Sequence, residues 1–494
     1  MARFSWCIFH GAIQSAISTA KLVESFPIPS FRATSIAIEL AKARQNGWSR
    51  NVDIRTFLTL ADEFGWLRRI HAPVSPHLEM AKVIHALGEE LTLFENVPDW
   101  PTSVIAGVCS QRRYLALALG VDENALLPTM LAALINPSAP EVVTIAPCQE
   151  VVEDDVDITH LPILTHFSTD GGPYITSAVA VVQVPGLGRN LSFHRLMRFG
   201  KRCFTVRLVE GRGLHTAWTK SKGHLPVAMC LGAPPQVQLA ASMSPAAGVD
   251  EMTIANTLAL TPTVKALCSD LEIPADTEIV LEGYLSQETG DEGPFIDLTR
   301  TRDFIRQQPF FIVERVTHRR NPIFQALLPG GEEHRLLMGM PREPTIYEAV
   351  NRVCRCLGVC ITPGGGHWLH AVVQIDKQKT DDGLLAIEAA FRGHSSLKHV
   401  VIVDRDIDAY DCQAVEWSIA TRFQADKGLV VLKEQPGSSL DPSSTHIPGQ
   451  KTRTGKMGLD ATIPWDTPAG PNRLEDFITV DYEPCDLTMY LRSS

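Results

Sequence analysis

The chain has 494 residues, of which 45% are hydrophobic and 20% are charged, and its formal net charge at pH 7 is −11. This composition is that of a globular protein with two or three domains, and it excludes wholesale disorder. The acidic balance argues against a nucleic-acid surface, which is normally basic. No apolar run reaches the roughly 20 residues that a membrane-spanning helix needs.

The cysteines and the N-terminal segment bear on the compartment. Eleven cysteines show no regular pairing pattern, and no secretory signal is recognisable. We therefore expect free thiols in a reducing, cytoplasmic compartment. The first 23 residues contain no Asp or Glu and include Arg3 and Lys21, so mitochondrial targeting is kept as an alternative. Residues 1–50 are otherwise poorly patterned, and we predict an extension there.

Residues 51–140 show the mixed pattern of a small N-terminal α/β domain. The amphipathic stretch 53–70 predicts one helix that begins with an Asp. Two short strands are expected over 91–97 and 102–108. Two helices, separated near residues 120–123, are expected within 114–135.

Residues 141–320 are dominated by short β-rich runs separated by Gly, Pro, Asp and Asn. These runs cover 141–146, 174–184, 203–209, 225–232, 277–285 and 310–318. Their density predicts a β-barrel or a sandwich, with a helix over 252–260.

Residues 321–494 alternate again between helix and strand patterns. Helices are predicted over 345–358, 383–393 and 412–423, and strands over 367–375, 398–404 and 427–433. This rhythm indicates a sheet covered by helices, followed by a tail rich in Pro, Ser and Gly after residue 434. Cys354, Cys356 and Cys360 form a CxCx3C cluster that we assign to an apolar helix. Their spacing does not match a paired zinc knuckle, so buried core thiols are the better interpretation.

Generic nucleotide and hydrolase motifs are missing. The sequence lacks a Walker phosphate loop, a GxGxxG after a predicted strand, and a GxSxG elbow.

An ordered set of polar residues carries more information. It consists of Asn190 and Arg195, then Glu251, then Glu292 and Asp297. Together they offer one fixed cation for an acidic substrate, two carboxyls five residues apart, and oxygen ligands for a hard metal. Such a set suits the removal or addition of a carboxyl group.

Several segments around these residues resemble the UbiD-type decarboxylases, which use prenylated flavin mononucleotide. The matching segments are TDGGPYIT (169–176), NLSFHR (190–195), LEIPADTEIVLEGYL (271–285), ETGDEGPFID (288–297), LPGGEEHRLLMGMPREPTIYEAV (328–350), TPGGGHWLHAVVQI (362–375), VVIVDRDIDAYD (400–411) and KMGLDAT (456–462). The resemblance implies an α+β multidomain fold: an N-terminal α/β domain, a central split β-barrel that binds the flavin, and a C-terminal α/β oligomerisation domain. It also implies a homodimer or a higher homo-oligomer.

The resemblance further implies a reversible, non-oxidative decarboxylase of an aromatic, heteroaromatic or α,β-unsaturated carboxylic acid. Arg195 matches the arginine near the substrate carboxylate, and Glu292 matches the glutamate that pairs with this arginine. Asp297 matches the acid that delivers a proton. The cofactor would be prenylated FMN, supplied by a flavin prenyltransferase, because loss of CO2 from an sp2 carbon needs an electron sink that no side chain provides.

The implied cofactor contacts come mostly from one segment. They are Asn190, Ser192, Phe193, His194, Arg195, Glu251 and Arg392. Asn190 and Glu251 also match two ligands of a divalent cation, usually Mn2+, and K+ is a further candidate ion.

One position departs from the family pattern. The third metal ligand of the family is a histidine 18 residues after the arginine, and here that position is Gly213. His215, two residues further on, is the substitute we expect, and Glu210 is another candidate. A catalytically silent flavin-binding or assembly protein that has lost a metal ligand is therefore the alternative function.

Overall fold

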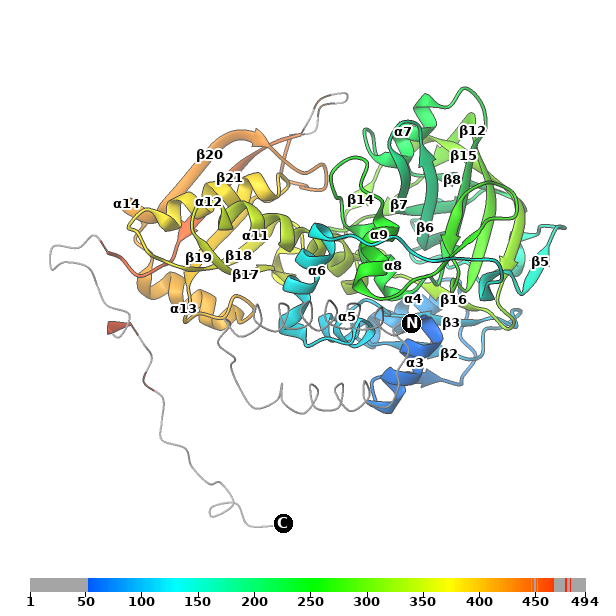
Figure 1. The fold of residues 1–494 in the computed structure, drawn as a ribbon, viewed down its shortest axis with the longest axis horizontal. Coiled ribbons are helices and arrows are strands. Elements are labelled where there is room, and N and C mark those ends of the chain that lie inside the picture. Colours follow the sequence, from blue (N-terminus) through cyan, green and yellow to red (C-terminus); the bar gives the residue numbers. More distant parts are fainter. Residues whose placement is uncertain are drawn as a thin grey trace, which may run out of the picture. The chain divides into compact units, whose positions relative to one another are not determined.

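The computed structural model describes residues 52–445, 447, 450, 452–465, 476, 477 and 480 (Figure 1). The predicted extension over residues 1–50 lies outside the described residues, as does most of the tail. All described residues belong to one unit, Ser49–Ser494. In this part of the chain no single helix is long and apolar enough to cross a membrane; the stretches Arg112–Leu119 and Glu123–Ile135 pass that test only as a pair, which is bent by 81°.

The N-terminal part is a small α/β unit. Its elements are α3 (Ile54–Glu63), β1 (Arg68–Ile70), α4 (Glu79–Ala86), β2 (Thr92–Phe94), β3 (Ser103–Ala106), α5 (Arg112–Leu119) and α6 (Leu126–Ile135). The strands form a sheet in the order β1-β2-β3-β16, so β16 (Ile323–Ala326), which follows the barrel in the chain, completes it beside β3.

The single helix predicted over 53–70 is wrong in its second half. Asp53 caps α3 as expected, since its side chain accepts a hydrogen bond from the Thr56 N–H. The helix ends at Glu63, however, and Gly65 follows with a φ of +68°. Glycine adopts this left-handed conformation without a steric penalty, which ends the helix and redirects the chain into β1. The two helices predicted within 114–135 are confirmed by α5 and α6.

The central part is a closed antiparallel barrel. Its strands are β6 (Tyr174–Val184), β7 (Gly188–Arg198), β8 (Cys203–Val206), β9 (Leu225–Leu231), β12 (Ile279–Glu292) and β15 (Arg306–His318). The order β12-β9-β6-β7-β8-β15 closes because β12 also pairs with β15 (Figure 1). The short strand β5 (Val151–Glu153) pairs with the last residues of β15, beyond the part that pairs with β8. The barrel prediction is thereby confirmed, and closure leaves these strands with few exposed edges.

Smaller elements surround the barrel. A three-stranded sheet consists of β4 (Val142–Val143), β10 (Thr263–Lys265) and β11 (Glu272–Pro274), and a hairpin consists of β13 (Phe295–Ile296) and β14 (Arg302–Asp303). The helices are α7 (Gly213–Lys220), α8 (Pro235–Ser242) and α9 (Glu251–Leu258), and α10 (Glu332–Gly339) with the short η4 (Met340–Arg342) leads to the C-terminal part.

The C-terminal part is a mixed sheet with helices. It contains α11 (Glu343–Asn351), β17 (Arg355–Ile361), β18 (His370–Asp376), α12 (Asp382–Gly393), β19 (His399–Asp404), α13 (Cys412–Arg422), α14 (Ala425–Gly428), β20 (Leu429–Pro436) and β21 (Arg453–Asp460). The strand order is β17-β18-β19-β21-β20, and the three central strands are parallel.

The helix predicted over 345–358 is too long. It ends at Asn351, and the cysteine-containing segment forms strand β17, which pairs with β18. A short apolar run has no decisive period, so pairing with an available neighbour strand decides its conformation. Cys356 and Cys360 are buried in two separate hydrophobic clusters of the sheet, and burial raises the pKa of both thiols.

Candidate active site

Strand β7 carries most of the predicted cofactor contacts, and its alternation separates them onto two faces. Asn190, Ser192 and His194 lie opposite Val182, Ala180 and Ala178 of β6, which belong to the barrel core. Because directly opposed residues share a face, these three side chains point toward the core face. Arg195 and Phe193 lie on the other face. Asn190 and Arg195 are five residues apart, about 16 Å along an extended strand.

Arg195 is the centre of an ion-pair cluster. Its Nε and Nη2 donate to Glu292 at 2.8 and 3.0 Å. Nη1 donates to Asp297 Oδ2 at 3.0 Å, and Nη2 also reaches Asp303 Oδ2 at 2.7 Å. The structure therefore brings together Arg195, Glu292 and Asp297, the three residues that the sequence nominated for catalysis, and adds a third carboxylate.

The cluster holds its charges despite burial. Burial alone would lower the pKa of Arg195, but its hydrogen bonds and charge interactions with the carboxylates, Glu292 first, outweigh that and raise the pKa. Burial likewise pushes the pKa of Asp303 upward, yet Arg195 and Arg306 hold the pKa below its usual value. Arg195 is therefore a permanent cation, which is what a carboxylate-binding group must be.

Glu292 is completely buried and is held from two directions. Beside its fork with Arg195, it accepts a hydrogen bond from the Tyr174 hydroxyl at 3.1 Å. Burial and the nearby Glu292 carboxylate raise the pKa of Tyr174, so the phenol keeps its proton and remains a donor. The ring of Phe295 lies 4.2 Å from the Arg195 guanidinium carbon. These contacts lock the orientation of the guanidinium.

His334, on α10, borders Asp297. Burial lowers the pKa of His334, and the charges of Asp297 and Arg195 act on it in opposite directions. The Gly330 N–H donates to its Nδ1 at 3.0 Å. Since Nδ1 is an acceptor, the neutral ring carries its proton on Nε2.

Ser192 and His194 contact each other on the core-side face of β7. The Ser192 hydroxyl lies 3.0 Å from His194 Nε2, and His194 Nδ1 lies 2.9 Å from the Arg207 carbonyl oxygen. The carbonyl can only accept, so Nδ1 carries the proton and Nε2 accepts from the hydroxyl. Burial lowers the pKa of His194 to about 4, which keeps the ring neutral.

Asn190 and Glu251, the two predicted metal ligands, are in direct contact. Asn190 Nδ2 donates to Glu251 Oε1 at 2.9 Å, and the Leu191 N–H donates to Oε2 at 2.9 Å. Burial raises the pKa of Glu251 to about 7. Asn190 Oδ1 is buried and has no hydrogen-bond partner. An orphaned amide oxygen next to a buried carboxylate fits two oxygen ligands of a hard cation.

Gly213 faces this orphaned oxygen. A Cβ atom on Gly213 would lie 2.1 Å from Asn190 Oδ1, so the Asn190 amide occupies the space that a larger residue would need. His215 Nδ1 accepts from the Gly211 N–H at 3.3 Å, and Glu210 is an exposed partner of Arg207 at 3.2 Å. Within the described ranges no group of three or more His, Cys, Asp or Glu side chains is arranged to hold a metal. Asn190 and Glu251 are thus the two predicted ligands that the structure places in contact, and none of the contacts of His215 or Glu210 among the described residues joins them to this pair.

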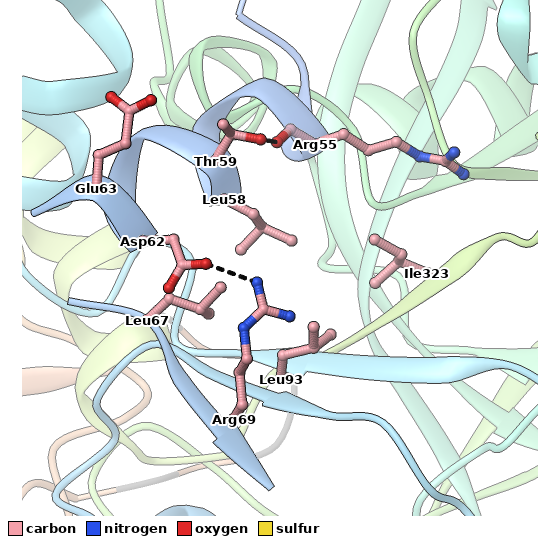
Figure 2. Close-up of a pocket in the computed structure, with 9 residues that line it drawn as sticks. All are labelled: Arg55, Leu58, Thr59, Asp62, Glu63, Leu67, Arg69, Leu93 and Ile323. Carbon is pink, nitrogen blue, oxygen red and sulfur yellow. Dashed lines mark hydrogen bonds and ion pairs between the residues drawn. The ribbon is translucent and has the colours of Figure 1, made fainter. Parts of the chain in front are cut away.

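Two further features lie apart from this cluster. Arg392 is exposed on α12, where it pairs with Glu388 at 3.6 Å, and none of its described contacts joins it to β7. A surface pocket lies between α3 and the N-terminal sheet (Figure 2). It is lined by Arg55, Leu58, Thr59, Asp62, Glu63, Leu67, Arg69, Leu93 and Ile323, none of which was predicted as a site residue.

Sequence reasoning missed four residues of the Arg195 cluster: Tyr174, Phe295, Asp303 and His334. Tyr174, Phe295 and His334 lie inside the matched segments 169–176, 288–297 and 328–350, so a signal for them existed. Asp303 lies in no matched segment, and only the β13–β14 hairpin brings it to Arg195.

Comparisons with known proteins identify the family of this chain. Three models of the 3-octaprenyl-4-hydroxybenzoate carboxy-lyase family match in succession: the N-terminal domain over residues 58–134, the Rift-related domain over 141–332 and the C-terminal domain over 335–461. The anhydromevalonate phosphate decarboxylase of Methanosarcina mazei is 41% identical over 414 residues, which cover 83% of this chain and 95% of that protein. The enzyme of the same name from Methanothermobacter thermautotrophicus is 38% identical, covering 79% and 92%.

Solved structures point the same way. The UbiD-class enzyme HmfF from Pelotomaculum thermopropionicum, in complex with FMN, superposes with a TM-score of 0.83 at 34% identity, covering 88% of this chain and 99% of that one. The apo 3,4-dihydroxybenzoic acid decarboxylase of Enterobacter cloacae gives 0.80 at 26% identity, covering 89% and 99%. The chain belongs to the UbiD family of carboxy-lyases.

Proposed function

We propose that this carboxy-lyase acts on a phosphorylated, α,β-unsaturated aliphatic acid of the anhydromevalonate phosphate kind. Loss of water from a β-hydroxy acid such as mevalonate leaves a double bond conjugated with the carboxylate. Of the three acid classes predicted from the sequence, the relatives at 38% and 41% identity favour the α,β-unsaturated class. The observation that carries the proposal is the fixed Arg195 cation beside the carboxyl of Asp297.

Arg195 would bind the substrate carboxylate. Glu292 holds the Nε side of the guanidinium, while Nη1 and Nη2 point to Asp297 and Asp303, which are partly accessible. The substrate carboxylate would accept hydrogen bonds from Nη1 and Nη2 of Arg195, in place of some of those now made to Asp297 and Asp303. The Glu292 fork and the Phe295 ring keep the guanidinium plane in place during that exchange.

Asp297 would deliver the proton that replaces CO2. A proton donor must lie within hydrogen-bond reach of the reacting carbon's position, and Asp297 sits at the open end of the Arg195 cluster. The charge of Asp297 acts on His334, so a neutral His334 would help to keep a proton available to Asp297. Tyr174 and Phe295 are both buried beside the Arg195–Glu292 pair, and they would limit the access of water to this side of the site after CO2 is released.

Prenylated FMN is the proposed cofactor, in line with the FMN and prenylated-FMN complexes of HmfF. When bound, it would supply the electron sink that decarboxylation at an sp2 carbon requires. Asn190 and Glu251 would supply oxygen ligands for a divalent cation, Mn2+ in our proposal, which would offset negative charge at the cofactor site. A flavin prenyltransferase would supply the cofactor, and a homodimer is the proposed assembly.

The test is turnover by protein co-expressed with a flavin prenyltransferase. CO2 release is measured with anhydromevalonate phosphate, its unphosphorylated acid, cinnamic acid and 3,4-dihydroxybenzoic acid. We expect the phosphorylated aliphatic acid to give the highest kcat/KM. Preference for an aromatic acid would reject the substrate assignment. No turnover of any acid by flavin-loaded protein would instead favour the silent alternative, whose main support is Gly213.

A further inference from the structure

A second group of basic side chains is recognised from the contacts and mutual charge effects around Arg342 in η4. It consists of Arg342, Arg212, His394 and Lys456, and we call it the basic cluster. Arg342 Nη2 donates to Ser244 Oγ at 2.7 Å, and its guanidinium carbon lies 5.9 Å from the Trp368 ring. The Trp368 and His394 rings are 4.4 Å apart in an edge-on arrangement.

Three members of the basic cluster differ from Arg195 in their ion pairs. No ion pair among the described residues involves Arg342, Arg212 or His394, whereas Arg195 has three acidic partners. Burial lowers the pKa of Arg342 to about 10, and the charge of Arg212 contributes to this. Burial lowers the pKa of His394 to about 3, and the charges of Arg342, Lys456 and Arg212 add to the effect. Repulsion among these positive charges favours the binding of an anion beside them.

Two buried polar atoms in the basic cluster have no partner. They are Arg342 Nε and His394 Nε2, and the His394 residue is 6% exposed. Buried polar groups are nearly always hydrogen-bonded, so these two unpartnered nitrogens beside other basic side chains are available to bind an anion. A planar guanidinium with a free Nε edge is the geometry that binds phosphate through two parallel hydrogen bonds.

The basic cluster is connected to the Arg195 cluster through one helical segment. His334, which borders Asp297, and Arg342 lie eight residues apart on α10 and η4, on the order of 12 Å at the helical rise. Arg212 precedes Gly213, whose backbone touches the Asn190 amide. An elongated acid could therefore have its carboxylate at Arg195 and a second anionic group near Arg342.

We propose that Arg342, with Arg212 and His394, binds the phosphate monoester of the substrate. This inference rests on the proposed function, because it assigns the phosphate of the proposed substrate. Two guanidinium charges match the dianion of a phosphate monoester. The flavin phosphate has the same chemistry, so the experiment must separate the two sources.

The experiment compares flavin-loaded wild-type, Arg342→Ala, Arg342→Lys and Arg352→Ala proteins; Arg352 is exposed at the end of α11. Binding of monobutyl phosphate is measured by calorimetry, and flavin content by absorbance and intact mass. Loss of a charge-assisted hydrogen-bond donor should weaken monobutyl phosphate binding by roughly 10- to 100-fold in Arg342→Ala, with flavin content retained. Arg342→Lys should retain part of the affinity for monobutyl phosphate, because lysine keeps the positive charge but lacks the two parallel N–H donors of the guanidinium. The preference for the phosphorylated over the unphosphorylated acid should fall by a similar factor.

Each other result has a distinct meaning. The proposal would be overturned if the wild type did not bind monobutyl phosphate. It would also be overturned if folded Arg342→Ala and Arg342→Lys bound monobutyl phosphate as tightly as the wild type. Loss of flavin from Arg342→Ala would overturn the substrate assignment and give the basic cluster to the cofactor phosphate. If Arg342-dependent binding persists while the wild type releases no CO2 from any phosphorylated acid, the proposed function fails and the anion subsite stands.

Discussion

Arg195 and Glu292 face each other through two parallel hydrogen bonds of 2.8 and 3.0 Å, and Glu292 is completely inaccessible to solvent. The two residues are 97 positions apart in the chain, on β7 and at the end of β12. A buried carboxylate of this kind is stable only while its cation is present. The pair is therefore both a structural element and the means by which Arg195 is oriented.

Glu292→Gln should separate these roles. The amide preserves the shape but replaces one acceptor oxygen with a donor that faces the Arg195 N–H groups. We expect kcat to fall on the order of 100-fold and the free energy of unfolding to fall by about 1–3 kcal/mol. Initial rates of CO2 release and urea unfolding measure the two effects. Glu288→Gln, on an exposed part of the same strand, is the matched control, and wild-type kcat in Glu292→Gln would remove Glu292 from the orienting role.

Asp297→Asn removes the proposed proton donor while leaving a group that can still contact Arg195. The rate of product formation should drop by roughly 100- to 10,000-fold. Solvent-deuterium exchange into the product's vinylic position should disappear with it. Exchange is followed by NMR in D2O with flavin-loaded enzyme, and Asp291→Asn, exposed on β12, serves as the control. Persistent exchange in Asp297→Asn would show that another group carries the proton.

Gly213→Ala tests the contact between Gly213 and Asn190. The new Cβ would stand 2.1 Å from Asn190 Oδ1, so the amide must turn and its bond to Glu251 must break. We expect a loss of stability of about 1–3 kcal/mol and less bound manganese than in the wild type. Thermal unfolding and metal analysis of the purified protein give both values. Gly223→Ala, where no atom lies within 4 Å of the added Cβ, should match the wild type; unchanged manganese in Gly213→Ala would mean that Asn190 is not a ligand.

Glu333 predicts a pH dependence of stability. Burial raises the pKa of Glu333 to about 7 from a usual 4.5, although it accepts hydrogen bonds from the Gly107 and Cys109 N–H groups. Between these two values the native state keeps a proton that the unfolded chain has lost, so this carboxyl makes stability fall as pH rises from 4.5 to 7. The full effect is about 3 kcal/mol.

The amide side chain of the Glu333→Gln variant cannot titrate. The decrease in unfolding free energy from pH 5 to pH 8 should therefore be smaller in this variant than in the wild type, by about 3 kcal/mol. Urea unfolding at both pH values gives the difference. Glu416→Gln, exposed on α13, should keep the wild-type dependence. An identical pH dependence in Glu333→Gln would show that Glu333 is ionised throughout.

The fold could be predicted from the sequence where local patterns were strong. The Asp53 cap, the two helices within 114–135 and the β-rich centre were all readable because caps and periodicity act over a few residues. The sequence did not predict the end of α3 before Gly65 or the change from α11 to β17. Each of these depends on a competing interaction, a left-handed glycine turn in one case and pairing with β18 in the other.

The resemblance predicted those residues of the candidate site that lie in the matched segments. Arg195, Glu292 and Asp297 were nominated together, and the structure places them in contact. The sequence did not predict Asp303, because only the β13–β14 hairpin brings this residue to Arg195. The neutrality of His334 and His194 also depended on burial, which no spacing in the sequence reveals.

The sequence by itself determined the family, the order of the three parts and the identity of the principal charged groups, because these are carried by residue types in a fixed order. Only the tertiary structure decided how those groups are paired. Barrel closure by β12 and β15 brings Glu292 to Arg195, and the orphaned oxygen of Asn190 turns toward Gly213. Arg342 and His394 come together around Trp368, and neither has an ion-pair partner in the described part of the chain. Such contacts join residues tens to hundreds of positions apart, and their strength depends on exclusion of water, which arises only when the chain is packed.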